Sequence, residues 1–96
     1  MTAMSGKYVV RARDVVHKEL DSRGVLLNLE SGTYYTLNRT GTFVWSLMDG
    51  KRDVQGLVEA LTERFQVERD AASRDVEALI SDLEREGLIE LRDGPA

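Results

Sequence analysis

The sequence contains no cysteine and only one histidine, His17. The lack of cysteine excludes disulfide bonds, thiolate metal ligands and a thiol nucleophile. A zinc site of the usual kind would need more histidine or cysteine ligands, and a catalytic triad would have to pair a serine with His17. Carboxylates alone could hold a magnesium ion, but here they follow the exposed faces of predicted helices. We therefore predict that the protein is not an enzyme and holds neither a metal ion nor a cofactor.

Proline and long apolar runs are also scarce. The chain has 96 residues and one proline, which predicts a single domain over residues 1–96 with an ordered core at about residues 8–91. A membrane span would need a run of about 18 apolar residues, and none is present. The start of the chain lacks the apolar stretch of a signal peptide. Together with the absence of cysteine, these features favour a cytoplasmic protein with no membrane partner.

The stretch GVLLNLESGTYYTLN, residues 24–38, predicts a β-hairpin around Ser31 and Gly32. A two-residue loop would pair Leu29 with Tyr34. A three-residue loop with Gly32 in a left-handed conformation would instead pair Leu29 with Thr33. We favour the second register because it gathers most of the apolar side chains on one face. That face would hold Val25, Leu27, Leu29, Tyr35 and Leu37, and the opposite face would hold Leu26, Asn28, Tyr34 and Thr36.

The rest of the chain predicts an α+β fold, with a three-stranded antiparallel sheet followed by three helices. The first strand is Val15–Leu20, and the segment before it, residues 8–13, is extended or partly loose. Apolar residues at helical spacing predict helices at residues 39–48, 54–65 and 70–86. Asn38, Asp53 and Asp70 are the expected N-caps, and Gly87 is the expected left-handed C-cap. Residues 49–52 end the first helix, and residues 88–91 form a short extended tail.

The third strand is expected to lie at the edge of this sheet, with backbone groups left unpaired. Such an edge accepts an extended peptide as an added strand. The neighbouring Tyr34 and Tyr35 have two interpretations. In the first, Tyr35 belongs to the core and Tyr34 is an exposed strand residue. In the second, Tyr34 flanks a peptide-docking edge.

The order and spacing of four segments resemble the PqqD family, whose members are small recognition domains for ribosomally made precursor peptides. The segments are VLLNLESGTYYTLN, TGTFVWSLMDGKRDV, LVEALTERF and DVEALISDLEREGLIEL, and the resemblance runs from about Val15 to Leu91. It implies a winged-helix-like arrangement. It also implies that the leader segment of a precursor peptide docks as an extra strand against the third strand, in a groove walled by the third helix.

Carried onto this sequence, the resemblance places the docking strand at residues 33–37 and the groove helix at residues 70–86. The helix positions in the site are taken from its exposed and border residues. The expected peptide-binding residues are Thr33, Tyr34, Tyr35, Thr36, Leu37, Arg74, Asp75, Ala78, Leu79 and Asp82. The resemblance implies no catalysis. It implies that the domain presents the leader to a partner enzyme, such as a radical SAM enzyme in pyrroloquinoline quinone synthesis or a leader peptidase in lasso-peptide synthesis.

The alternative hypothesis is a winged-helix DNA-binding transcription regulator that uses the third helix for recognition. Two features oppose it. The formal net charge of the chain is −4, and residues 68–86 hold seven acidic residues against three arginines. A helix that faces phosphates should carry the opposite balance. The chain also stops too soon after Leu91 to form the wing hairpin expected of such a regulator. A plain dimerisation module is a third hypothesis, and it would show self-association without affinity for a peptide.

Overall fold

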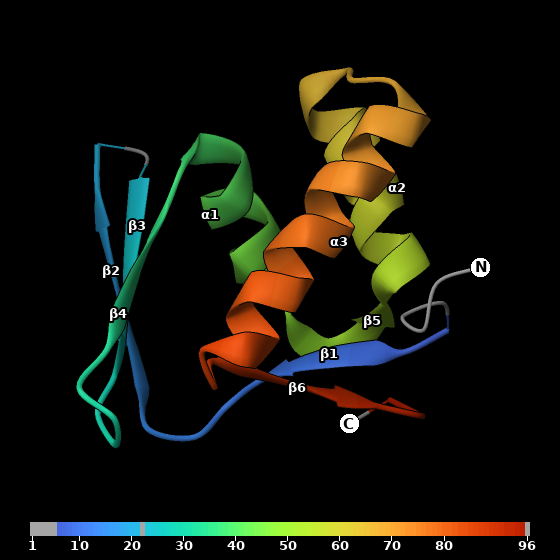
Figure 1. The fold of residues 1–96 in the computed structure, drawn as a ribbon. Helices are drawn as coiled ribbons and strands as arrows, with labels where there is room; N and C mark the ends of the chain where they lie inside the picture. The colour runs from blue at the N-terminus through green and yellow to red at the C-terminus, as the bar shows by residue number, and fades with distance from the viewer. Residues whose placement is uncertain (1–5, 22, 96) are drawn as a thin grey trace.

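The computed structural model describes residues 6–21 and 23–95; residues 1–5, 96 and the expected turn residue Ser22 lie outside the described residues. The described chain is α+β, with two three-stranded antiparallel sheets and three helices (Figure 1). The strands are β1 (Tyr8–Arg11), β2 (Val15–Leu20), β3 (Arg23–Asn28), β4 (Tyr34–Leu37), β5 (Asp49–Asp53) and β6 (Ile89–Arg92). The helices are α1 (Arg39–Ser46), α2 (Val54–Phe65) and α3 (Arg69–Arg85).

The predicted three-stranded sheet is confirmed in its strand order, β2-β3-β4. Its inner face packs on α1, and α1 lies between this sheet and the other two helices (Figure 1). The core residues come from both sheets and all three helices. The largest fully buried side chains include Trp45, Leu26, Leu37, Met48 and Leu57. Among residues 6–21 and 23–95, no helix has the length and apolar character needed to cross a membrane.

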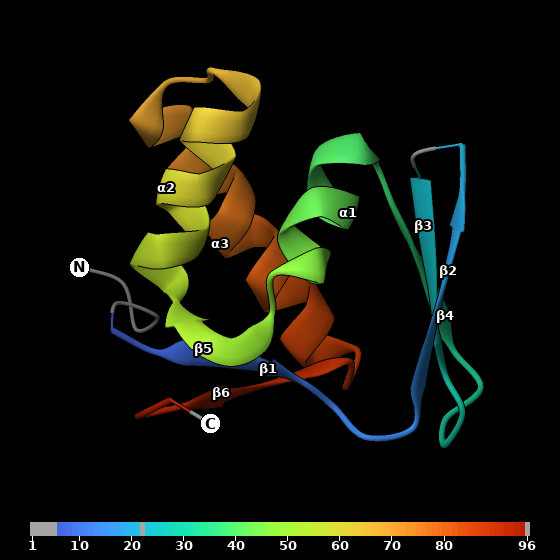
Figure 2. The same ribbon diagram turned by 180° about the vertical axis from the view of Figure 1, so that it is seen from behind.

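The second sheet, of order β5-β1-β6, corrects the prediction of a single sheet. Residues 8–11 and 89–92 pair along their whole length, and β5 occupies the segment expected only to end the first helix. Figure 2 shows this sheet lying beneath α2 and α3. Each of its strands has only four or five residues. Strands this short show too little alternation to be recognised, and their partners lie far away in the sequence.

The register of the β3–β4 hairpin differs from both predicted registers. Leu26 pairs with Tyr35, and the connecting loop has four residues, 29–32. The buried side chain of Asn28 organises this loop, because its Oδ1 accepts hydrogen bonds from the backbone N–H groups of Glu30 (2.9 Å) and Ser31 (3.2 Å). Compared with the favoured register, this pairing is shifted by one residue. A shift of one residue turns every β3 side chain to the other face of the sheet.

The inward face of β3 is therefore the reverse of the prediction. Leu26, expected on the polar face, has no exposed surface, whereas Leu29, expected in the core, is 58% exposed. In β4 the prediction holds, since Leu37 is buried and Tyr35 packs against the core.

Two of the three predicted helix caps are confirmed. The Oδ1 atom of Asn38 accepts a 2.8 Å hydrogen bond from the N–H of Gly41, and Asp53 does the same for α2. The cap predicted at Asp70 is wrong, because α3 begins at Arg69 and its N-cap position is Glu68, without a side-chain capping bond. Gly87 has a φ of +74°, as expected for a left-handed C-cap.

Candidate functional site

β4 is an edge strand, and only alternate residues of its backbone hydrogen-bond to β3. The N–H of Asn28 donates a 2.9 Å hydrogen bond to the carbonyl oxygen of Thr33. Because hydrogen-bonded pairs alternate along an antiparallel ladder, Tyr35 also bonds to β3. The N–H and C=O groups of Tyr34 and Thr36 consequently point away from β3. Within the described chain no strand pairs with them, so they can bond to an added strand.

A cavity of about 330 Å³ lies beside this edge, between β4, α1 and α3. Its lining combines apolar side chains with a few polar ones. The lining residues are Tyr35, Thr36, Leu37, Asn38, Thr40, Gly41, Val44, Leu61, Asp75, Val76, Ala78 and Leu79. A concave, mainly apolar site with a few polar groups is the usual form of a ligand-binding pocket. Here it adjoins unpaired backbone groups, which suits an extended peptide.

The floor of the cavity depends on the close approach of α1 to β4. A Cβ atom on Gly41 would lie only 3.1 Å from Asn38 Oδ1 and 3.4 Å from Leu37 Cδ2. Glycine at this position therefore lets the first turn of α1 pack directly against the end of β4. This explains a glycine in the first turn of the helix, where it costs up to about 1 kcal/mol relative to alanine.

One end of the cavity is marked by a polar contact between β4 and α3. The Tyr35 hydroxyl donates a 3.0 Å hydrogen bond to Asp82 Oδ2, and Arg85 forms a 2.7 Å ion pair with Asp82 Oδ1. The Arg85 guanidinium, and after it the Tyr35 hydroxyl, hold the pKa of Asp82 below its ordinary value of 3.8. Burial, followed by the hydrogen bond to Asp82, raises the pKa of Tyr35 above 10.0. Near neutral pH the pair is therefore a phenol bonded to a carboxylate.

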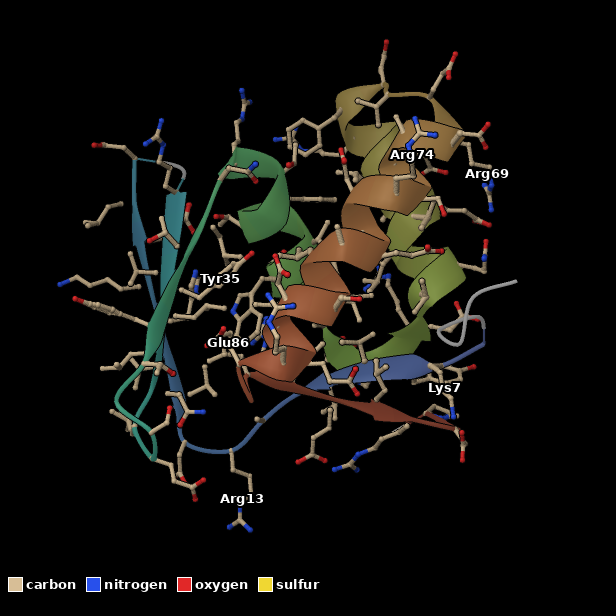
Figure 3. The ribbon with its side chains drawn as sticks, viewed as in Figure 1. Lys7, Arg13, Tyr35, Arg69, Arg74 and Glu86 are labelled. Atoms are coloured by element: carbon tan, nitrogen blue, oxygen red, sulfur yellow. The ribbon has the colours of Figure 1, made fainter. Side chains whose placement is uncertain are left out.

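Most of the sequence-predicted site residues come together here. Those that line the cavity are Tyr35, Thr36, Leu37, Asp75, Ala78 and Leu79. Asp82 joins them through Tyr35, and Tyr34 lies next to them on β4 with 70% of its surface exposed. Figure 3 shows Tyr35 directed toward α3 from β4.

Four predicted residues do not line the cavity: Tyr34 and Asp82, which adjoin it, and Thr33 and Arg74. Thr33 precedes β4, and its side chain forms a 2.8 Å hydrogen bond with the hydroxyl of Ser31. Arg74 is exposed toward the other end of α3 from Tyr35 (Figure 3).

Sequence reasoning missed the part of the cavity that α1 and α2 supply. These residues are Asn38, Thr40, Gly41, Val44 and Leu61, and Val76 of α3 was missed as well. The sequence signal that could have found them is Gly41. A glycine in the first turn of a helix indicates that another segment packs closely against that turn. No group of three or more histidine, aspartate or glutamate side chains in the described ranges is placed to hold a metal ion.

Comparisons with known proteins identify the family of this chain. Residues 23–89 match the family described as coenzyme PQQ synthesis protein D (PqqD). The chain therefore belongs to the PqqD family, and the resemblance inferred from the sequence is confirmed. No curated protein gives a significant sequence match.

Two solved structures are similar in fold and sequence. TbiB1 in complex with the TbiA(beta) leader peptide is 30% identical to this chain, with a TM-score of 0.76, over 84% of this chain and 94% of that one. Lasso peptide synthetase B1 complexed with the leader peptide is 27% identical, with a TM-score of 0.74, over 85% of this chain and 96% of that one. Each is described as a complex with a leader peptide.

Proposed function

We propose that this protein binds the leader segment of a ribosomally made precursor peptide by strand addition at β4. The observation that carries the proposal is the open edge of β4 beside a cavity walled by α3. Both similar solved structures are described as leader-peptide complexes, which supports the same role here. In this mode, backbone hydrogen bonds supply affinity and side-chain pockets supply specificity.

The proposed contacts divide into two kinds. The outward backbone groups of Tyr34 and Thr36 bond to the leader strand. Alternate side chains of the leader then point into the cavity, because side chains of a strand alternate between its faces. The residues proposed to contact the leader, through backbone or side chain, are Thr33, Tyr34, Tyr35, Thr36, Leu37, Arg74, Asp75, Ala78, Leu79 and Asp82. Of these, Ala78 leaves space for a leader side chain, because it is small and lines the cavity.

The protein has no catalytic role in this proposal. It holds the leader and presents the precursor to a partner enzyme in the cytoplasm, either a radical SAM enzyme or a leader peptidase. We further infer that the fold is winged-helix-like. Support comes from the chain order, in which β5 separates α1 from α2 and β6 follows α3 in the same sheet. The acidic balance of the third helix still opposes DNA binding.

The test is calorimetric titration with a synthetic leader of the precursor peptide encoded beside the gene. Ala78→Trp should fill the cavity and weaken leader binding by at least about tenfold, which corresponds to about 1.4 kcal/mol. Glu84→Trp is the matched control, because residue 84 lies about 120° around α3 from residue 78 and is exposed. Leader affinity should survive that substitution. Equal affinity of both variants would contradict the assignment of the groove.

A further inference from the structure

The sheet β2-β3-β4 has an outer face that points away from α1. Leu26 in β3 is fully buried and His17 in β2 lies 6.2 Å from the Trp45 ring, measured between ring centroids, so the alternate residues of each strand point outward. We call these residues the outer face: Val16, Lys18 and Leu20 of β2, Arg23, Val25 and Leu27 of β3, and Tyr34 and Thr36 of β4.

The outer face carries an exposed apolar row. Val16 pairs with Leu27, which pairs in turn with Tyr34, so their side chains form one line across the three strands. Val16 is 46% exposed and Leu20 is 57% exposed. Among the described residues, no helix or strand covers this face (Figures 1 and 2). Contiguous exposed apolar surface bordered by polar residues is typical of interaction sites.

The charges on the outer face select the kind of partner. Lys18 and Arg23 are its charged residues, and both are basic, although the whole chain has a net charge of −4. Lys18 lies opposite Val25, in the middle of the apolar surface, and Arg23 lies opposite Leu20. A hollow bordered by Leu20, Arg23 and Thr36 continues the face to the edge of β4; Asp21, at the β2–β3 turn, also borders it.

A second copy of this chain fits the outer face poorly. A twofold contact through one patch places each residue near its own counterpart or its neighbours. Lys18 and Arg23 would then meet Lys18 and Arg23 of the other copy. Like charges brought together across an interface oppose association. A surface that is apolar and carries acidic groups fits instead.

We propose that the outer face of β2-β3-β4 docks the partner enzyme, through an apolar patch on the enzyme flanked by acidic side chains. This inference rests on the proposed leader-binding function. A leader strand added at β4 would extend the same sheet, so its outward side chains would lie beside Tyr34 and Thr36. An enzyme on the outer face therefore contacts the recognition domain and the bound leader together.

The experiment uses the purified peptidase or modifying enzyme encoded beside the gene, measured against the full chain by biolayer interferometry with leader present. Val16→Glu and Lys18→Glu lie on β2, two strands from the docking edge. Each should weaken enzyme binding by at least about tenfold. Leader affinity, measured by calorimetry, should stay within about twofold of the original chain. Val67→Glu is the matched control, because Val67 is an exposed apolar residue between α2 and α3.

The results separate this inference from the proposed function. Unchanged enzyme affinity in both β2 variants would overturn the docking face. It would also be overturned if sedimentation showed that the original chain is a dimer and that Val16→Glu makes it monomeric. A chain that binds the enzyme but not the leader would overturn the proposed function and not the docking face. Circular dichroism melting checks that each variant folds. Lys18→Glu decides the question alone if Val16→Glu does not fold, since it exchanges one exposed charged residue for another.

Discussion

The hydroxyl of Tyr35 donates a 3.0 Å hydrogen bond to the carboxylate of Asp82, and this bond joins β4 to α3 across 47 residues of sequence. This polar contact holds β4 and α3, which are two walls of the cavity, at a fixed spacing at one end. Because Arg85 binds the other oxygen of the same carboxylate, the position of Asp82 is fixed from two sides. The charge of Asp82 should therefore affect both stability and groove geometry.

The first prediction concerns acid stability. Since the folded state depresses the pKa of Asp82 below 3.8, its contribution to stability is complete above that value and is lost as the pH falls through the depressed pKa. Asp82→Asn should remove this part of the acid dependence. Arg85→Ala should reduce it more than Tyr35→Phe, because the guanidinium has the larger effect on the pKa. Urea midpoints measured from pH 7 down to about pH 2 test this, and identical profiles for Asp82→Asn and the original chain would refute it.

The second prediction concerns the backbone of β4. Proline is tolerated at an edge position whose N–H faces away from the sheet, and it is not tolerated where the N–H bonds inward. Thr36→Pro should leave the domain folded while weakening leader binding at least about tenfold. Tyr35→Pro should unfold the domain, because it removes a ladder hydrogen bond and the ring that packs on the core. Circular dichroism melting and leader calorimetry on both variants distinguish the cases; normal leader binding by Thr36→Pro would show that the edge is not the docking site.

The third prediction tests the register of the β3–β4 hairpin. Leu26→Ala should cost about 2–5 kcal/mol of unfolding free energy, as truncation of a buried leucine does. Leu29→Ala should change it by no more than about 0.5 kcal/mol, because the Leu29 side chain is mostly exposed. The register favoured from the sequence would give the opposite order. Urea denaturation of the two variants therefore decides between the registers.

The fourth prediction concerns Asn28, which connects the hairpin loop to the end of α3. Its Nδ2 donates a 3.2 Å hydrogen bond to the carbonyl oxygen of Gly87, in addition to the two bonds that its Oδ1 accepts. Asn28→Asp keeps the acceptor but loses this donor and places a charge at a buried position. We expect a loss of about 1–3 kcal/mol or more in unfolding free energy. Asn38→Asp, at an exposed N-cap position, is the control and should be nearly neutral; a similar loss in both variants would argue against the role of Asn28.

The helices could be predicted because their signals are local. The stripe of Val54, Leu57, Val58 and Leu61, together with the cap at Asp53, specifies α2 to the residue. The open edge of β4 also followed from strand order alone. The favoured register, although wrong, leaves the same backbone groups outward, those of Tyr34 and Thr36. The reason is that Thr33 bonds to β3 in either register, and alternation then fixes the rest of β4.

The register and the second sheet could not be predicted because they depend on distant partners. Asn28 is a polar residue that the fold buries, since its amide meets both the hairpin loop and Gly87, 59 residues later. The alternating sequence pattern placed Asn28 on the exposed face, and this error displaced the predicted register of the whole strand. In the same way β1 gains its strand partners from residues 49–53 and 89–92. The cavity was only half predicted, because the part supplied by α1 depends on packing against Leu37.

The shortness of β4 limits how much of a leader the domain can cover. The strand has four residues, which at about 3.3 Å per residue is about 13 Å of backbone. It is closed at one end by the helix that begins at Arg39 and at the other by the loop that Asn28 holds. Only a few residues of a bound leader can therefore pair with β4. The remainder of the leader, and the core peptide beyond it, stay free to reach an active site on another protein.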